Sequence, residues 1–366
     1  MPCNACFIDG RSVALAEATH AAAGLIAASR LPVFLIGASD VAGARAAIRL
    51  AACVGGAVDH IASEGALREL DVMRSFGKFI VTPSEARNRA DTVLLIGSSL
   101  TKAWPDMADV LGLAAAPRLA LQPGRREILW IGADREEGLA RLAGQTIVTA
   151  DETLPAVIAA LRARNAGRRV GLAASELASL DAIVEKLQRA QFGLVVYNPS
   201  ILDALAIEMV AGLVADLNRT TRFSTISGGG AGNAETLMQT AGWMTGFPVR
   251  IGLGRGYPEH DPWRFGARRL VESREADLVV WIASNTAELP VWAAETTLAA
   301  LTAATSNIPA AKVQITVGEH GRDHDAVEFV RETQSLAWRR ASKHSDVPSA
   351  AALLDDILAS LTREAA

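Results

Sequence analysis

The sequence predicts an α/β protein with doubly wound, mainly parallel sheets. Short apolar runs alternate with segments of helical periodicity along most of the 366 residues. This is the pattern of a parallel sheet covered on both faces. Two glycine clusters, at 228–232 and 252–256, follow strand-like runs. Such loops at the carboxyl ends of strands build the ligand crevices of doubly wound proteins. The chain length suits two domains or one large α/β unit.

Composition argues against two classes of partner. Half of the residues are hydrophobic and the net charge is −4, so a large core is available. No block or stripe of Lys and Arg stands out, which argues against nucleic-acid binding. No run approaches the ~20 apolar residues of a membrane span, and the first residues do not resemble a signal peptide. We therefore expect a cytoplasmic protein with apolar surface left for a partner protein.

The first half of the chain consists of successive strand–helix units. Leu31–Gly37 is an apolar run typical of a buried parallel strand, and 41–54 repeats apolar residues at helical spacing. Gly55 and Gly56 end that helix before the next extended piece, 57–59. Further strands are predicted at 78–81, 92–97, 117–122, 127–132 and 146–149, and a helix at 154–164.

The second half continues the alternation after a basic turn at 162–169. A helix at 177–190 precedes a strand at 192–197. The next helix, which reaches Leu217, carries a broad apolar stripe, and Ser200 is its expected N-cap. Strands are predicted at 222–227, 277–283 and 313–317, and helical segments with a tail at 326–366.

Cys3 and Cys6 form a C-x-x-C pair near the start of the sequence. This spacing suits a thiolate metal site or a redox pair. A zinc or iron–sulfur site needs four ligands, and the third cysteine, Cys53, lies far along the chain in a predicted helix. We therefore expect an idle pair rather than a metal site.

The glycine run before Asn233 could cradle a phosphate with its backbone N–H groups at a helix N-terminus. It is not a Walker A loop, because no Gly-Lys-Ser/Thr follows, and Asn233 replaces the third glycine of G-x-G-x-x-G. Glycine-rich loops also serve as tight turns against a neighbouring backbone. The residues alone leave both interpretations open.

Two histidine-containing segments are weak candidates for chemistry. His320 and His324 have the i,i+4 spacing that puts two metal ligands on one helix face, but a glycine between them indicates a polar loop. Glu259-His260-Asp261 could perform acid–base chemistry, but Pro258 and Pro262 mark it as an exposed turn. No G-x-S-x-G nucleophile elbow is present, so the sequence contains no assembled catalytic set.

Three motifs together resemble the B subunit of formylmethanofuran dehydrogenase, a family of molybdopterin or tungstopterin oxidoreductases. They are Gly229-Gly-Ala-Gly-Asn233, Gly242-Trp-Met-Thr-Gly-Phe-Pro248 and Gly254-Arg-Gly-Tyr-Pro258. Val58-Asp59 is similar to the family's ID strand end, and Asn88-Arg-Ala-Asp91 to its NRAD element. The likeness covers nearly the whole chain.

The sequence departs from this family at both redox centres. The family opens with four cysteines that hold a [4Fe–4S] cluster, and only Cys3 and Cys6 have counterparts here. Soon after the ID strand, family members place a cysteine or selenocysteine that binds the metal of the pterin. The corresponding segment here contains Ser63, Glu64 and Gly65 instead. The resemblance therefore implies that the molybdopterin or tungstopterin and the [4Fe–4S] cluster are lost, leaving no cofactor and no metal.

One branch shares these losses: the B subunit of the formyltransferase/hydrolase complex of methylotrophic bacteria. The resemblance implies a complex in one-carbon metabolism that transfers a formyl group from tetrahydromethanopterin to a methanofuran-type carrier and hydrolyses it to formate. The hydrolase would be the A subunit, and the formyltransferase would be the C and D subunits. This chain would be their non-catalytic structural partner.

The resemblance also implies two interleaved α/β domains without an iron–sulfur domain. One is discontinuous, over 1–62 and 190–366, and the other is inserted at 63–189. The family positions that line the pterin cleft match Gly228, Gly230, Asn233 and Arg255. We expect Arg255 to lie near the former active site and Asn233 to hydrogen-bond the glycine turn.

Two alternatives stay open. In the first, the chain is an active pterin-dependent dehydrogenase subunit in which Ser63 or Glu64 replaces the thiolate, although such metals prefer soft thiolate ligands. In the second, the glycine loops bind a pterin, a nucleotide or the polyglutamate arm of the carrier without chemistry.

Overall fold

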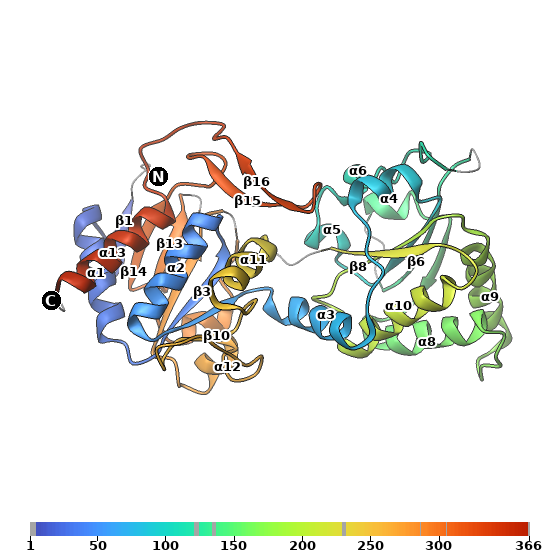
Figure 1. The fold of residues 1–366 in the computed structure, drawn as a ribbon, viewed down its shortest axis with the longest axis horizontal. Coiled ribbons are helices and arrows are strands. Elements are labelled where there is room, and N and C mark those ends of the chain that lie inside the picture. The colour runs from blue at the N-terminus through green and yellow to red at the C-terminus, as the bar shows by residue number, and fades with distance from the viewer. Residues whose placement is uncertain are drawn as a thin grey trace. The chain divides into compact units, whose positions relative to one another are not determined.

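The computed structural model describes residues 5–120, 124–133, 137–228, 232–285, 287–304 and 306–364. The chain divides into two compact units (Figure 1). Unit 1 comprises residues 1–63, 231–329 and 336–366, and unit 2 comprises residues 64–230 and 330–335. Unit 1 is therefore assembled from three separate stretches of the chain.

Unit 1 is built on one sheet with a parallel centre. Among the described residues, nine strands follow the order β11-β10-β4-β3-β12-β13-β14-β1-β2. The five from β4 to β14 are parallel neighbours, and antiparallel pairs extend both edges. The strands are β1 (Cys6–Ile8), β2 (Arg11–Val13), β3 (Pro32–Ala38), β4 (Ala57–His60), β10 (Ile251–Gly252), β11 (Glu259–His260), β12 (Leu278–Ala283), β13 (Thr297–Ala303) and β14 (Val313–Val317).

Helices pack on this sheet, and α2 shows why they form where they do. The Asp40 carboxylate accepts the N–H of Gly43 at 2.9 Å and caps the start of α2, and Gly55 ends the helix with φ at 68°. α2 packs against α11 and α13, and α1 packs against α13 (Figure 1). The helices of unit 1 are α1 (Leu15–Ala28), α2 (Val41–Val54), α11 (Ala234–Thr245), α12 (Ala267–Glu272), α13 (Ala350–Glu364) and the 3-10 helix η2 (Val291–Glu295).

The core of unit 1 contains a close contact between β3 and β12. A Cβ atom built at Gly37 would lie 2.2 Å from the Cη2 atom of Trp281. Trp281 is fully buried and packs in one cluster with Val33 and Leu35. Only glycine therefore fits at position 37 beside this ring, since packed interiors leave no room for even one added methyl group.

Unit 2 contains a second, entirely parallel sheet in the order β7-β6-β5-β8-β9 among the described residues. One hydrophobic cluster joins it to α8, α9 and α10, and another joins it to the segment from α4 to α6. The strands are β5 (Thr92–Ile96), β6 (Glu127–Gly132), β7 (Gln145–Val148), β8 (Gly193–Tyr197) and β9 (Phe223–Ser227). The helices are α3 (Ser63–Phe76), α4 (Pro83–Arg89), α5 (Leu100–Ala103), α6 (Met107–Val110), α7 (Glu137–Ala140), η1 (Asp151–Thr153), α8 (Leu154–Asn165), α9 (Ala174–Arg189) and α10 (Ala204–Leu217).

The predicted fold class, an α/β protein with parallel sheets, agrees with this architecture. The domain boundary expected between residues 189 and 190 differs from the structure. Residues 190–230 belong to unit 2, because β8 and β9 pair in parallel with β5 and complete its sheet. The chain leaves unit 1 after Ser63, one residue beyond the expected boundary.

Several predicted elements also differ from the structure. Residues 117–120 form a turn rather than a strand, and 121–122 lie outside the described residues. The predicted strand at 78–81 makes only a single bridge, at Ile80. A hairpin of β15 (Ala326–Val330) and β16 (Ser335–Arg339) replaces the helical segments expected there. The N-cap of α10 is Asp203 instead of Ser200.

None of the helices in the described part of the chain combines the length and apolar character that a membrane span needs.

Replacing Gly37 by Ala should destabilise the protein by about 1–3 kcal/mol, because the new methyl group collides with the buried Trp281 ring. Gly24→Ala, in the middle of α1 where a Cβ meets nothing within 4 Å, is the matched control and should stabilise the protein by about 0.5–1 kcal/mol. Urea unfolding of both variants measures this difference. Equal effects would show that the Gly37–Trp281 contact does not constrain the core.

Candidate functional site

The strand order of unit 1 reverses between β3 and β12, the place where doubly wound proteins bind ligands. Gly232, with φ at 70°, packs on this point: a Cβ built on it would lie 1.5 Å from the Gly37 carbonyl oxygen. The backbone at Gly232 therefore lies directly on the carboxyl end of β3, and residues 229–231 of the glycine loop lie outside the described residues. The sequence left two roles open for this loop, a phosphate cradle and a tight turn. The contact made by Gly232 is of the second kind, a turn packed against a neighbouring backbone.

A chain of polar side chains begins at the carboxyl end of β12. The Ser284 hydroxyl lies 2.8 Å from Nδ1 of His320, and Nε2 of His320 lies 3.1 Å from Oε2 of Glu328. Glu328 on β15 also pairs with Arg339 on β16 at 2.9 Å. Burial raises the pKa of the Glu328 carboxyl, but the hydrogen bond with His320 and the charge of Arg339 outweigh that effect and hold the pKa below its usual value.

This arrangement corrects one prediction about the histidines. His320 and His324 lie in a turn and form an isolated bridge with one another, not one face of a helix. His320 is held between a hydroxyl and a carboxylate, and burial lowers the pKa of His324. Ser284 is buried, and the contacts from Ser284 through His320 to Glu328 connect the end of β12 with the β15–β16 hairpin.

Asp59, the last but one residue of β4, is the centre of a second polar cluster in unit 1. Its carboxylate accepts the N–H groups of His60 and Ala267, each at 2.8 Å, and Nε of Arg250 lies 3.7 Å away. The same Arg250 nitrogen donates to the Ser63 hydroxyl at 3.2 Å. Burial raises the pKa of the Asp59 carboxyl, and Arg250 and the two backbone donors oppose that rise.

His60 is buried beside this cluster, with 2% of its surface exposed. Its Nδ1 accepts the N–H of Ala62 at 2.9 Å, so a neutral ring carries its proton on Nε2. Nε2 lies toward the Gly232 carbonyl, outside good hydrogen-bond geometry. Burial lowers the pKa of His60 to about 4, although the Gly232 carbonyl acts in the opposite direction. The imidazole is therefore neutral at physiological pH.

The segment that the motif resemblance matches to a metal thiolate, residues 63–65, is the start of α3. Ser63 is buried and bonded to Arg250, whereas Glu64 is exposed and pairs with Arg68 at 3.0 Å. A Cβ at Gly65 would lie 2.9 Å from backbone atoms of Pro199 and Ser200. Close backbone packing therefore explains the glycine, without reference to a ligand.

Within unit 2, side chains anchor α3 to the end of β8. The Tyr197 hydroxyl donates to Oε1 of Glu69 at 2.7 Å, and Lys78 forms an ion pair with the same oxygen. Burial and the Glu69 charge raise the pKa of Tyr197 well above its usual value, so it stays a donor. Arg68 donates to the Leu202 carbonyl at 3.2 Å. These contacts hold α3 against the end of β8 and the segment after it.

The residues matched to the family's pterin cleft lie in different surroundings. Gly228, in unit 2, donates its N–H to the Tyr197 carbonyl at 2.7 Å, and Gly230 lies outside the described residues. Asn233, in unit 1, adopts φ of 57° and donates to the Phe329 carbonyl at 2.9 Å. Its side-chain N–H therefore reaches β15, whereas residues 229–231 of the glycine turn, to which a bond was expected, lie outside the described residues.

Arg255 lies at the opposite end of the unit 1 strands from the switch point. β10 runs antiparallel to β4, and Leu253 donates to the Gly56 carbonyl at 3.0 Å, beside the amino end of β4. Arg255 is 59% exposed and lies 3.4 Å from Glu259. The arginine at the carboxyl end is Arg250, which motif matching did not select. Arg250 can be recognised only by its position opposite Asp59, and that position is known only from the pairing of β4 with β10.

The cysteines do not assemble a metal centre in the described part of the chain. Cys6 is buried on β1, where burial raises the pKa of its thiol, and Cys53 is exposed on α2. Cys3 lies outside the described residues. No group of three or more His, Cys, Asp or Glu side chains among the described residues is placed to bind a metal ion.

The Glu259-His260-Asp261 segment is structural. His260 on β11 stacks on Phe247, with ring centroids 5.4 Å apart, and its Nδ1 lies 2.7 Å from the Val249 carbonyl. Asp261 accepts the N–H groups of Trp263 and Arg264, which lower the pKa of its carboxyl. These interactions form the turn itself.

Replacing Arg250 by Met should destabilise the protein by about 3 kcal/mol at pH 7, because it leaves the buried Asp59 carboxylate without its cation. The loss should shrink at pH 5, where the isolated carboxyl is more readily protonated. Arg255→Met, which removes an exposed arginine from the same loop region, should change stability by less than about 0.5 kcal/mol. Denaturant titration of both variants at the two pH values is the measurement, and equal losses would contradict the assignment.

The depressed pKa of His60 predicts a loss of stability in acid. The unfolded chain binds a proton near pH 6.5 and the folded chain near pH 4, so this contribution is complete above pH 6.5 and disappears as the pH falls toward 4. Between pH 7.5 and 5.5 the wild type should lose about 1 kcal/mol more than His60→Asn. His20→Asn, an exposed change on α1, is the control and should keep the wild-type slope.

Comparison with known proteins identifies relatives of the whole chain. The B subunit of the formyltransferase/hydrolase complex Fhc of Methylorubrum extorquens is 31% identical over 350 residues, covering 94% of this chain and 93% of that protein. A chain in the crystal structure of that complex, FhcABCD with methylofuran, is 29% identical, with a TM-score of 0.87 over 99% of both chains. This match confirms the α/β fold class and the resemblance drawn from the motifs.

More distant relatives are redox enzymes. The B subunit of the tungsten-containing formylmethanofuran dehydrogenase 2 of Methanocaldococcus jannaschii is 28% identical over 252 residues, covering 65% of this chain and 56% of that protein. The corresponding protein of Methanococcus maripaludis is 25% identical over 295 residues. No protein-family model matches. From the extent of its identity to the Methylorubrum protein, the chain belongs to the family of B subunits of formyltransferase/hydrolase complexes.

Proposed function

We propose that this chain is the non-catalytic B subunit of a formyltransferase/hydrolase complex, and that it acts with A, C and D subunits in converting a formyl-carrying pterin to formate through a methanofuran-type carrier. The observation that carries the proposal is the match over 99% of both chains to a component of the Methylorubrum complex, which was solved with methylofuran. We further propose a cytoplasmic location, where the complex would work on soluble carriers.

The residues present do not fit the metal groups of the more distant dehydrogenases. A [4Fe–4S] cluster needs four thiolates, and the whole sequence contains three cysteines. A molybdenum or tungsten pterin needs a soft ligand near the start of α3. There the chain has Ser63, whose hydroxyl accepts from Arg250, and Gly65, which packs on backbone. We therefore propose that the chain works without either group.

The glycine loop supports a structural role in the same way. Its Gly232 rests on the carbonyl at the end of β3, at the place where doubly wound proteins bind ligands. Near that place the Ser284 hydroxyl and His320 bond to one another. These contacts support the proposal of a scaffold over that of a component that holds pterin or nucleotide.

A second candidate is an active dehydrogenase subunit, favoured by the 28% identity to the tungsten-containing enzyme of Methanocaldococcus jannaschii. It requires Ser63 or Glu64 as the metal ligand. Glu64 is exposed and paired with Arg68, and Ser63 is buried and bonded to Arg250. Both side chains would have to leave these partners, which makes this the weaker candidate.

The test is elemental analysis of the purified complex for Mo, W and Fe, per copy of this chain, together with formate production. We expect formate without stoichiometric metal in this chain. One equivalent of Mo or W would support the dehydrogenase. In the same complex Glu64→Gln should retain formate production, whereas loss of metal and activity together in this variant would identify Glu64 as a ligand and overturn the proposal.

A further inference from the structure

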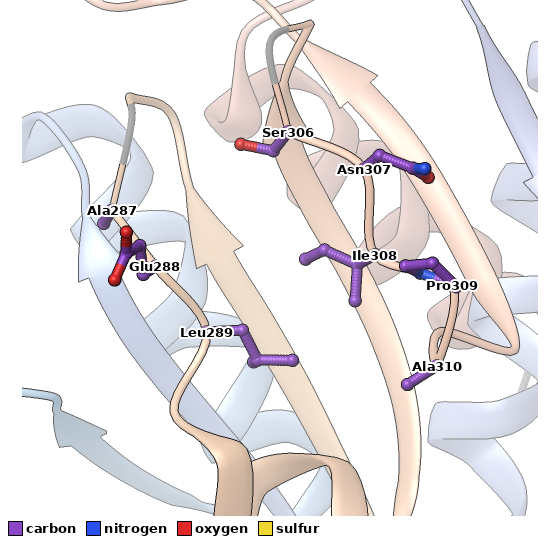
Figure 2. Close-up of a pocket in the computed structure, with 8 residues that line it drawn as sticks. All are labelled: Ala287, Glu288, Leu289, Ser306, Asn307, Ile308, Pro309 and Ala310. Atoms are coloured by element: carbon purple, nitrogen blue, oxygen red, sulfur yellow. The ribbon is translucent and has the colours of Figure 1, made fainter.

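Unit 1 contains a cavity of about 490 Å³ between the connections that leave β12 and β13. Figure 2 shows the Leu289 and Ile308 side chains pointing toward one another across this space from the two connections, with the Ser306 hydroxyl above it. The Asn307 amide points to the other side of its own connection (Figure 2). The volume lies within the range of small-molecule sites, ≈ 300–1,000 Å³.

The cavity exists because the described parts of these connections contain little helix. The connection from β12 to β13 contains only η2, and the described part of the connection from β13 to β14 contains no helix. Parallel strands are usually covered by a crossover helix. Here extended backbone covers them instead, and Leu289 and Ile308 pack on the hydrophobic cluster beneath. The floor of the cavity is therefore apolar.

The walls are held in place by side-chain amides. Gln314 on β14 is buried and donates to the Ser306 carbonyl at 2.9 Å and to the Thr302 hydroxyl at 3.2 Å, and it accepts the Ile308 N–H at 3.1 Å. On the opposite connection, Asn285 accepts the Ala287 N–H at 2.8 Å. A cavity with walls fixed in this way costs little reorganisation when a ligand binds.

The polar groups of the cavity restrict the class of ligand. Glu288 is the only charged residue among those that line it, and no described residue forms an ion pair or hydrogen bond with its side chain. The Ser306 hydroxyl likewise has no partner among the described residues. No described lining residue is cationic, so phosphates, carboxylates and nucleotides are disfavoured. We propose that this cavity binds a small amine: a compact apolar body on Leu289 and Ile308, with a protonated nitrogen near Glu288 and Ser306.

The test uses three probes of equal shape, benzylamine, benzyl alcohol and benzoate, titrated into the purified full-length chain by ligand-observed NMR. Benzylamine should bind about threefold more tightly than benzyl alcohol, the value of an exposed ion pair, and benzoate should bind most weakly. The preference for the amine should fall as salt is added, because salt screens exposed charges.

Variants separate the parts of the site. Glu288→Gln should abolish the preference for the amine without changing the affinity for the alcohol, and Ile308→Ala should weaken all three probes. Glu152→Gln removes the same charge from an exposed position in unit 2 and should leave the order unchanged. The proposal is overturned if no probe binds, if benzoate equals benzylamine, or if Glu288→Gln retains the preference. None of these outcomes bears on assembly with the A, C and D subunits, which is tested separately.

Discussion

The backbone contact between Gly232 and the Gly37 carbonyl constrains much of unit 1. Gly232 can make this contact only because it lacks a Cβ, which would collide with the carbonyl oxygen, and Gly37 separately leaves room for the Trp281 ring. The contact sets the place where α11 begins and brings Asn233 to the Phe329 carbonyl on β15. In other α/β proteins the glycines of such a loop approach a ligand. Here Gly232 approaches another part of the same chain.

Close packing also fixes the start of α3. Gly65 lies against the backbone at Pro199 and Ser200, and Glu69 accepts from Tyr197 beside the buried Lys78. Any side chain at position 65, a thiolate included, would have to displace the backbone at Pro199 and Ser200.

The sequence predicted the parallel sheets well, because buried parallel strands appear as short apolar runs. It missed β13, whose Leu- and Ala-rich residues also suit a helix, and the β15–β16 hairpin, whose pairing depends on Arg339 and Glu328 across the two strands. The family resemblance implied a domain boundary near 190, and nothing local in β8 reveals that this strand pairs with β5.

The site was harder to predict than the fold. Motif matching selected Arg255, an exposed residue at the amino end of β4, while the arginine that pairs with Asp59 is Arg250. β10 pairs antiparallel along β4, so Arg250 lies at the carboxyl end of β4 and Arg255 lies beyond its amino end. These positions follow from the pairing of segments that are distant in the sequence, and the local sequence does not reveal them.

The interleaving of the two units has a consequence for how the chain folds during synthesis. β3 must pair with β12, and Ala38 and Ser284, which are bonded across that pair, stand 246 residues apart in the sequence. All of unit 2 except the hairpin tip is translated in between. Unit 2 can close around local βα contacts while β3 still lacks β12 and β4 still lacks β10, and contacts so distant form late. An unpaired apolar strand is aggregation-prone, so the emerging amino-terminal strands are the part of this chain that most needs protection on the ribosome.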